Sequence, residues 1–314
     1  MIHTRGLRRT FTTRHTTVEA VKGVDLDIAE GEIFGFLGPN GAGKTTTLRM
    51  LSTLLPPTGG TATVAGADLL REPAKVRLHI GYVSQVGSSF AELTGRMELE
   101  MQGRIYGMSK AQARSRAAEL LTSLEIDDAA DRATKTYSGG QKRRLDVGIG
   151  LMHRPLLLFL DEPTTGLDPQ SRARMWEEVR KLRRAGTTVF LTTHYLEEAD
   201  ALCDRVAIID HGRIVSEGTP DELKRQVAGD VIVIGVEGEA GQALQLLQAQ
   251  SFVREANLED GSLRLCVDRG ETAMPQILRL FDHAGIELGS LSLHRPSLDD
   301  VFLQQTGRSL RDAA

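Results

Sequence analysis

The feature that most constrains the fold is a glycine-rich loop between a short apolar run and a helical segment. Ile33 to Leu37 is predicted to be a buried strand, and Thr47 to Leu55 a helix that Pro56 and Pro57 stop. Between them lie Gly38, Pro39, Asn40, Gly41, Ala42, Gly43, Lys44, Thr45 and Thr46. Glycines let backbone N–H groups turn inward around an anion, and the following helix points its positive end at the same place. The segment therefore predicts a phosphate-binding loop.

The stretch from Gly38 to Thr45 matches the P-loop pattern of nucleotide-binding proteins. In that pattern Lys44 places its charge on the β- and γ-phosphates, and Thr45 offers a hydroxyl to Mg²⁺. The alternative is an unrelated glycine-rich turn, but an apolar strand precedes this loop and a helix follows it. We therefore expect the ligand to be ATP, bound together with Mg²⁺.

A second apolar run, Leu156 to Leu160, ends in two carboxylates. Asp161 at the end of a buried strand beside a P-loop is placed to hold Mg²⁺, often through water. Glu162 can polarise the attacking water. Asp-Glu pairs on their own are common and usually solvated, so this interpretation depends on the P-loop.

Further strands are predicted over Val18 to Ile28, Thr187 to Leu191 and Val206 to Ile209, and a helix from about Leu196. An amphipathic helix is indicated by apolar residues at helical spacing: Ala113, Ala117, Leu120, Leu121 and Leu124. Strands that alternate with helices imply a mostly parallel sheet with both faces covered. The predicted fold class is therefore α/β.

A second anion-binding helix terminus is predicted where a short Ser-Gly-Gly sequence opens a helix from Lys142 to about Met152. Its residues are Ser138, Gly139, Gly140 and Gln141. The P-loop, this segment, the Asp-Glu pair and Thr192 to His194, in this order, resemble the ABC ATPase family over about Ile2 to Glu222. In that family the Ser-Gly-Gly motif of one subunit closes over ATP held by the P-loop of the other. The resemblance thus implies a P-loop NTPase fold with a helical subdomain and a head-to-tail homodimer that binds two ATPs.

The resemblance also implies roles for single residues. Phe11 lies where an aromatic ring stacks on adenine, although it is open to a simple core role. Gln85 matches a glutamine that touches Mg²⁺ and senses the partner, and Asp168 ends a loop that crosses to the other subunit. His194 matches a histidine that contacts the γ-phosphate, and Tyr137 replaces a commoner Leu. The implied catalytic residues are Glu162, His194, Lys44 and Gln85, and the implied metal ligands are Thr45, Gln85 and Asp161.

The chain is predicted to form two domains. Residues 1–225 form the ATPase domain, with the helical subdomain over about 87–155, and residues 226–314 a small α+β domain. The second part has the order β-α-β-β-α-β, which is typical of a ferredoxin-like fold. Its second helix, Thr272 to Ala284, requires Pro275 in the first turn, and Ser297 to Asp300 resembles a capping box that opens a last helix.

The segment from Ser297 to Leu303, followed by Thr306 and Gly307, resembles the C-terminus of daunorubicin/doxorubicin-resistance ATPase subunits. That subgroup implies an exporter of drugs or other amphiphiles, driven through a separately encoded integral membrane subunit. The apolar residues Leu298, Val301 and Phe302 form either a partner surface or a helix packed on its own domain. The alternatives for the whole chain are a soluble ABC protein acting on ribosomes or DNA, and an importer ATPase.

The bulk composition excludes some classes. A net charge of −4 gives no global basic field to attract nucleic acid. Cys203 and Cys266 are expected to be buried free thiols. The longest apolar run, Leu156 to Leu160, is too short to span a membrane, and the N-terminus lacks the apolar core of a signal peptide. We expect a cytoplasmic protein that its membrane partner holds at the inner face of the cell membrane.

Overall fold

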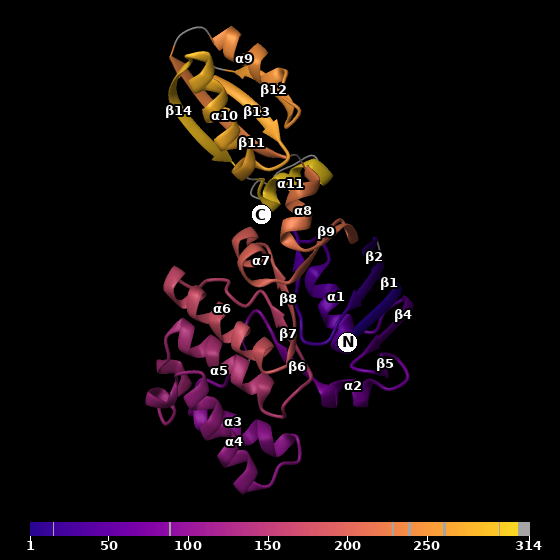
Figure 1. Cartoon of the computed structure of the whole chain (residues 1–314). Helices are drawn as coiled ribbons and strands as arrows, with labels where there is room; N and C mark the ends of the chain where they lie inside the picture. The colour runs from indigo at the N-terminus through magenta and orange to yellow at the C-terminus, as the bar shows by residue number, and fades with distance from the viewer. Residues whose placement is uncertain are drawn as a thin grey trace. The chain divides into compact units, whose positions relative to one another are not determined.

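The computed structural model describes residues 1–14, 16–87, 89–227, 229–237, 240–259, 262–294 and 296–306. The chain divides into two compact units, and the second begins at Gly218 (Figure 1). The predicted break, after Arg225, lay eight residues later than this one. The difference is helix α8 (Pro220–Val227), which packs against the last helix, α11 (Leu298–Thr306), of the second unit.

A six-stranded sheet organises the first unit, in the order β10-β9-β3-β8-β7-β6. Its strands are β3 (Ile33–Leu37), β6 (Ile80–Val83), β7 (Leu157–Asp161), β8 (Thr188–Thr193), β9 (Arg205–Asp210) and β10 (Arg213–Gly218). The five neighbours from β9 to β6 pair in parallel. Parallel strands end at one edge of a sheet, so the loops that follow β3, β6, β7 and β8 meet there.

Three helices pack against strands of this sheet (Figure 1): α1 (Lys44–Leu51), α6 (Pro169–Arg184) and α7 (Leu196–Leu202). Two predicted boundaries were wrong. The helix after the P-loop begins at Lys44, because Gly43 takes the N-cap position with a φ of 107°, so Lys44, Thr45 and Thr46 belong to its first turn. Leu156 is half exposed and lies before β7, whose five residues are all buried.

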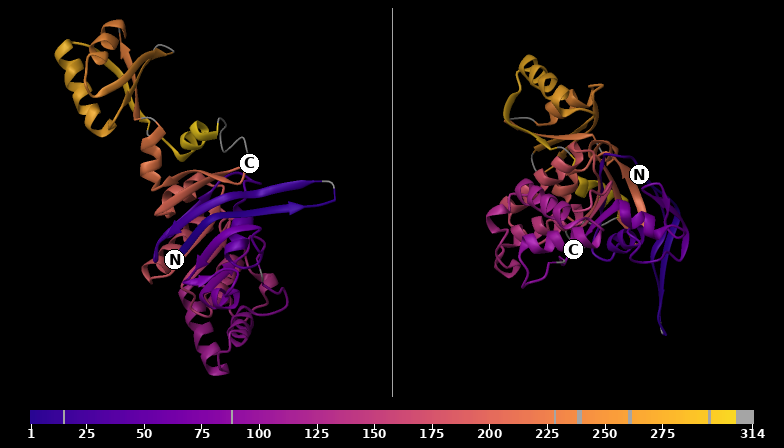
Figure 2. Two further views of the ribbon diagram at one scale, coloured as in Figure 1. Left: turned by 90° about the vertical axis from the view of Figure 1, so that its right-hand side faces the viewer. Right: turned by 90° about the horizontal axis from the view of Figure 1, so that it is seen from below.

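A second, antiparallel sheet in the order β2-β1-β4-β5 completes the core of the first unit. Its strands are β1 (Ile2–Thr12), β2 (Thr17–Ile28), β4 (Gly59–Val64) and β5 (Ala67–Asp68). Helix α2 (Pro73–His79) follows β5. Figure 2 shows β1 and β2 running on together as a long pair beyond the other strands. Buried residues of both sheets form one core cluster.

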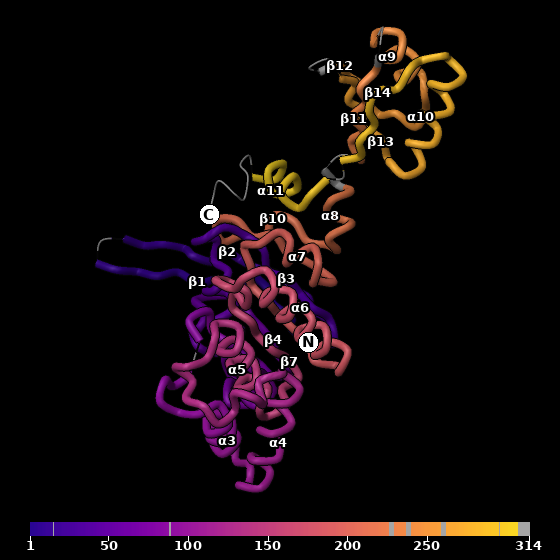
Figure 3. Tube along the Cα trace, turned by 90° about the vertical axis from the view of Figure 1, so that its left-hand side faces the viewer, coloured from indigo at the N-terminus to yellow at the C-terminus, as the bar shows by residue number. Residues whose placement is uncertain are grey.

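A group of helices lies within the predicted subdomain of residues 87–155 (Figure 3). It contains α3 (Gly95–Ile105), α4 (Lys110–Ser123), α5 (Gly139–Leu151) and two short 3₁₀ turns, Asp127–Ala129 and Thr134–Thr136. Helix α5 begins three residues before the predicted start at Lys142. The reason is local: Ser138 caps it, and its side chain accepts a hydrogen bond from the backbone N–H of Gln141.

The second unit contains a four-stranded sheet in the order β12-β13-β11-β14, in which every pair is antiparallel. Its elements are β11 (Asp230–Glu237), α9 (Ala240–Gln248), β12 (Val253–Glu259), β13 (Ser262–Val267), α10 (Gly270–Ala284) and β14 (Glu287–His294). Both helices contribute to its apolar core. This confirms the ferredoxin-like prediction.

Three details of the second unit differ from expectation. Pro275 lies inside α10 rather than in its first turn, because the helix begins two residues early, at Gly270. Cys266 is only partly buried, whereas Cys203 is buried, and both thiols are free. Leu298, Val301 and Phe302 are buried on α11, so they are not available as an open partner surface. Within the described residues, no helix has the length and apolar character to cross a membrane.

Candidate functional site

The P-loop lies at the carboxyl end of β3, between β8 and β9. Close backbone approaches fix its shape: a Cβ on Gly38 would lie 2.3 Å from the carbonyl oxygen of Ile209, and one on Gly43 would lie 2.6 Å from that of Ala20. Only glycine fits at both positions. The first turn of α1 follows at once, and its backbone N–H groups have no partners within the helix. The loop and the helix end thus form an anion site.

Lys44 is a buried cation at the start of α1. Its Nζ donates to the carbonyl oxygens of Gly38 at 2.7 Å and Pro39 at 3.1 Å, and lies 3.4 Å from Glu162 Oε1. Burial lowers the pKa of the ammonium, and the nearby carboxylates of Glu162 and Asp161 oppose that change. The charge is therefore held inside the loop by carbonyl oxygens and carboxylates.

Asp161 ends β7 and is buried. Its Oδ1 accepts hydrogen bonds from Thr45 Oγ1 at 3.1 Å and from Thr192 Oγ1 at 2.6 Å. Thr192 is its register partner on β8. A hydroxyl and a carboxylate side by side are the hard oxygen ligands that Mg²⁺ prefers, and the metal usually takes its remaining ligands from phosphates and water. The two residues fit the predicted metal site.

Glu162 is buried and has a left-handed backbone with a φ of 46°. For a residue with a side chain this conformation costs roughly 1–2 kcal/mol. Its N–H lies 3.0 Å from Thr192 Oγ1, and its Oε2 accepts hydrogen bonds from Gln85 Nε2 at 2.9 Å and Thr165 Oγ1 at 3.2 Å. Burial raises the pKa of this carboxyl, but His194, Lys44 and Thr165 outweigh burial and lower the pKa to about 2.

Gln85 and His194 follow β6 and β8, the two parallel strands on either side of β7. His194 Nδ1 lies 3.3 Å from Glu162 Oε2, and its ring lies against Tyr195. The structure therefore brings six predicted residues together. We call them the nucleotide-site cluster: Lys44, Thr45, Gln85, Asp161, Glu162 and His194.

The signature segment, Ser138 to Gln141, lies elsewhere on the first unit. Ser138 Oγ accepts from Gln141 N at 3.2 Å, and Gln141 Oε1 accepts from Ser138 N at 3.0 Å, which is a complete capping box. Gly140 approaches Ser171, whose N–H and hydroxyl both donate to Asp168. Ser138, Gly139 and Asp168 are exposed. In the described part of the chain, no hydrogen bond or ion pair joins them to the nucleotide-site cluster.

Two aromatic residues have defined surroundings. Phe11 lies on β1, is 39% exposed, and has the Arg9 guanidinium carbon 4.7 Å from its ring centroid. It is therefore not a core residue, which removes the alternative role. Tyr137 is buried, and its hydroxyl donates to the Ala129 carbonyl at 2.7 Å. A Tyr in place of Leu is thus accommodated with its polar atom satisfied.

Three residues around the cluster were missed from the sequence. Thr192 and Thr165 bond to Asp161 and Glu162, and Arg143 on α5 bonds to backbone carbonyls of the same loops. Thr192 carries a usable signal, because it directly follows the predicted strand Thr187 to Leu191, which forms most of β8 beside β7. Arg143 carries none, since it is one of three successive cations and only the fold buries it.

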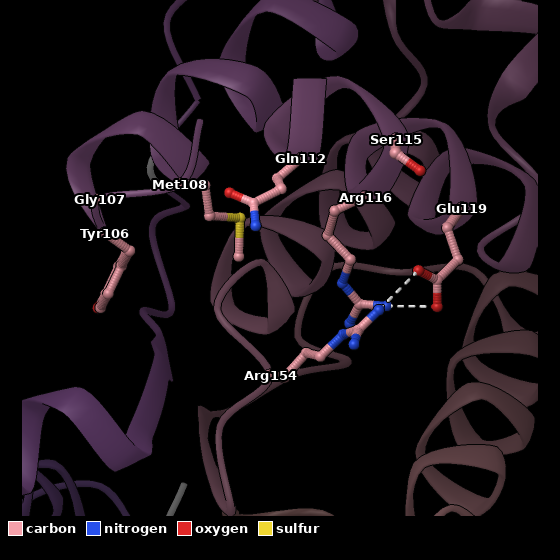
Figure 4. Close-up of a pocket in the computed structure, with 8 residues that line it drawn as sticks. All are labelled: Tyr106, Gly107, Met108, Gln112, Ser115, Arg116, Glu119 and Arg154. Carbon is pink, nitrogen blue, oxygen red and sulfur yellow. Dashed lines mark hydrogen bonds and ion pairs between the residues drawn. The ribbon is translucent and has the colours of Figure 1, made fainter. Parts of the chain in front are cut away.

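A separate pocket lies between the end of α3, helix α4 and Arg154 (Figure 4). In it the Glu119 carboxylate forms ion pairs with two guanidinium groups, those of Arg116 at 2.5 Å and Arg154 at 3.3 Å. The pocket is lined by none of the predicted site residues. Its two cations already share a carboxylate, which weakens them as an anion site.

The fold and the cluster define a nucleotide-hydrolysing cassette, and comparison with known proteins agrees. Residues 21–165 match the family described as ABC transporter, and residues 218–306 match the C-terminal domain of DrrA1-3-like ATP-binding proteins. The chain is 46% identical to the daunorubicin resistance ATP-binding protein DrrA2 of Streptomyces coeruleorubidus, over 94% of this chain and 92% of that protein. It therefore belongs to the ABC transporter family, as an ATP-binding subunit with an ATPase domain.

Other relatives have related names. The linearmycin resistance ATP-binding protein LnrL of Bacillus subtilis is 39% identical over 93% of this chain and 95% of its own length. The Nod factor export ATP-binding protein I of Ralstonia nicotianae is 38% identical over 99% and 95%. A dimeric ATP-binding cassette solved in a post-hydrolysis state with ADP and Pi superposes with a TM-score of 0.65 at 28% identity, covering 70% of this chain and 98% of that one.

Proposed function

We propose that the nucleotide-site cluster binds Mg-ATP and hydrolyses it within a head-to-tail dimer of this chain, and that the dimer drives export through a separate membrane subunit. The observation that carries the proposal is the meeting of Lys44, Asp161 and Glu162 at the carboxyl ends of β3 and β7, the two strands on either side of β8. Two segments that lie far apart in the sequence supply one site with a cation, a metal ligand and a carboxylate beside the position of the attacking water.

The charges of the cluster suit a metal–phosphate ligand. One cation, Lys44, stands against the two carboxylates of Asp161 and Glu162. Such a site repels a bare triphosphate and accepts one whose charge a divalent ion offsets. Thr45 and Asp161 would hold Mg²⁺, with Gln85 beside them, and the ion would supply Lewis-acid stabilisation of the phosphates.

Glu162 acts on the attacking water as a fixed carboxylate. A group with a pKa of about 2 is ionised throughout the neutral range. We assign it the role of accepting a hydrogen bond from the water, orienting it and taking up its proton. Gln85 and His194 both lie against its Oε2, and we assign His194 the contact with the γ-phosphate.

The exposed signature segment supports a composite site. Helix α5 presents N–H groups and a capped first turn to the surface, and Asp168 lies beside it in the segment that the resemblance assigns to the subunit crossing. A phosphate held by the P-loop of a second copy would complete this surface. Each site would then use Lys44 and Glu162 of one chain and Ser138, Gly139, Gly140 and Gln141 of the other, with Phe11 against the adenine.

Mixing two inactive variants tests the composite site. In a heterodimer of Ser138→Arg and Glu162→Gln chains, one site carries both substitutions and the other carries neither. We expect ATPase activity to reappear on mixing. Each heterodimer has one intact site of two and should reach about half of the rate of a wild-type dimer. Mixing Lys44→Ala with Glu162→Gln is the matched control, because both lesions lie in the same half-site and every heterodimer site keeps one. Heterodimers that form without recovered activity would refute the composite site.

Exposed apolar residues mark the surface that we assign to the membrane subunit. Val86 follows Gln85 directly, and Phe90, Met97, Met101 and Ile105 continue the surface onto α3. The backbone of Phe90 is fixed on both sides: its N–H donates to Glu98 at 2.8 Å and its carbonyl accepts from Thr134 at 2.7 Å.

Phe90→Asp should release the chain from membranes that contain its transporter, with ATP affinity unchanged. Leu303→Asp, at an exposed apolar residue of α11, is the control.

The transported class is inferred from the relatives. Their names concern resistance to daunorubicin and linearmycin and export of Nod factor, and we propose that this subunit also serves export of amphiphilic molecules from the cytoplasmic side. Nothing in these relatives favours an importer or a ribosome- or DNA-acting protein. Loss of export or resistance in cells that carry Glu162→Gln would support the assignment, and unchanged resistance would contradict it.

A further inference from the structure

Arg143 is a buried cation in the second turn of α5, and the functions described above give it no role. Its guanidinium makes three hydrogen bonds, each from a different nitrogen. Nε donates to the Pro163 carbonyl at 2.8 Å, Nη2 to the Asp161 carbonyl at 3.0 Å, and Nη1 to the Ser84 carbonyl at 2.5 Å. Only the rigid, planar fork of an arginine reaches three acceptors in this arrangement.

The three carbonyls flank the groups that act on the phosphate and the water. Ser84 directly precedes Gln85, while Asp161 and Pro163 lie immediately before and after Glu162. Glu162 has a strained left-handed backbone, and such conformations persist where the surroundings over-determine them. Thr192 accepts a hydrogen bond from the N–H of Glu162, and Arg143 binds the carbonyl oxygens of the residues before and after it.

The other end of the same helix is the signature segment. Helix α5 begins at Gly139, directly after Ser138, and Arg143 is its fifth residue. A helix is a stiff element, so a shift at its first turn displaces the guanidinium as well. One side chain therefore links the predicted contact with a partner's nucleotide to the loops that carry Gln85 and Glu162.

We propose that Arg143 is a positioning residue for hydrolysis, which couples capture of the partner's nucleotide at the N-terminus of α5 to the placement of Gln85 and Glu162. This inference rests on the proposed function. It predicts that loss of Arg143 reduces the rate of hydrolysis rather than the binding of ATP to one chain. Among the described residues, no hydrogen bond joins Arg143 to Lys44 or to the P-loop glycines.

The test compares Arg143→Met with Arg144→Met in the full-length protein. Arg144 is the next residue of the same helix and is also largely buried, but its guanidinium lies 3.9 Å from Glu125, away from the catalytic loops. We expect Arg143→Met to lower kcat about 10–100-fold, as misplacement of a catalytic group does, with KM for ATP and the affinity of one chain for ATP within about threefold. Arg143→Lys keeps the charge without the fork and should recover only part of the rate.

A double-mutant cycle separates positioning from general weakening. If Arg143 acts through Glu162, adding Arg143→Met to Glu162→Gln should lower the remaining rate by less than about threefold. An equal loss in both backgrounds, or a kcat for Arg143→Met that matches Arg144→Met, would overturn the inference. So would a failure of both Arg143 variants to fold while Arg144→Met folds, since Arg143 would then be a folding residue. A wild-type chain without ATPase activity, or a fully active Glu162→Gln, would instead count against the proposed function.

Discussion

The two units of this chain differ in what they bury. All buried charged side chains among the described residues lie in the first unit, and seven of them are Lys44, Glu98, Arg143, Asp146, Asp161, Glu162 and Glu198. The buried side chains of the second unit, as far as the structure describes it, are apolar. Buried charges cost free energy unless they are paired, so only a unit that performs chemistry is expected to retain so many.

The same contrast appears in the backbone. In the first unit Glu162 has a positive φ at the end of a core strand, and the P-loop depends on Gly38 and Gly43 where a Cβ would meet a carbonyl oxygen. The second unit has positive φ at Gly285, a glycine that ends α10 in the usual manner of helix C-termini. The first unit therefore accepts strain for function, and the second is built for its own stability. Four predictions examine this contrast.

Glu162→Gln should have the largest effect. Gln keeps the size of the side chain but removes the charge that orients the water, and loss of such a group costs about 10²–10⁴ in rate. ATP binding should survive, so ATP should now hold a dimer that size-exclusion chromatography detects. Glu178→Gln is the control, because Glu178 is equally buried but pairs with Lys181 on α6. Undiminished hydrolysis, or a monomer with ATP, would show that Glu162 is an ordinary buried charge.

Lys44→Ala should follow in magnitude. It removes the cation aimed at the β- and γ-phosphates, and truncating one partner of a buried charge contact costs about 2–5 kcal/mol of binding, or roughly 30- to 5,000-fold in affinity. Lys75→Ala is a matched control: its Nζ also lies 3.4 Å from a glutamate oxygen, of Glu72, but at the surface. Isothermal titration with ATP should show the loss for Lys44 alone. Equal affinities for the two variants would mean that burial of the cation contributes nothing.

Glu98→Gln should change the pH dependence of stability. Burial raises the pKa of Glu98 to about 7, with the Asp146 charge adding to the shift and the Phe90 N–H opposing it. Between about pH 4.5 and 7 the unfolded chain binds fewer protons than the folded chain, so the wild type loses stability as pH rises and the loss is complete above pH 7. Gln has no proton to lose. Relative to wild type, its free energy of unfolding should therefore increase by about 1–3 kcal/mol from pH 5 to pH 8.

Urea denaturation at several pH values measures this trend. Glu92→Gln removes an exposed carboxylate that pairs with Lys135 and controls for the change in net charge. The same trend in both variants would assign the effect to net charge. A flat difference for Glu98→Gln would show that this carboxyl ionises normally in the folded protein.

Much of the fold was predictable because strand and turn signals are local. The run Ile33 to Leu37 matches β3 residue for residue, and the β-α-β-β-α-β order led to the correct topology of the second unit. Helix starts were predicted less well. Gly43 and Gly139 lie at the starts of α1 and α5, and because glycine is typical of loops, the sequence pattern placed both starts three residues too late. The nucleotide-site cluster was predictable from four spaced motifs, whereas Arg143 was not, because its three acceptors are backbone carbonyls that any sequence would supply.

Truncation should have the smallest effect on ATP binding and tests whether the units are independent. The core cluster that joins the two sheets of the first unit ends at Ile209, with Ile214 packed against it, and the core of the second begins at Ile232. A chain that ends at Glu217 should therefore fold and bind Mg-ATP with an affinity within about twofold of that of the full chain, since domains with their own cores fold alone.

A chain cut after Arg225 keeps most of α8 without α11. It exposes the otherwise buried Leu223, whose burial is worth roughly 1.5–3 kcal/mol, so this longer chain should aggregate sooner than the shorter one. Thermal melting and ATP titration on both samples decide the matter. If the chain ending at Glu217 is unfolded or cannot bind ATP, the second unit is part of the ATPase core, and the contrast between a chemical and a structural unit fails.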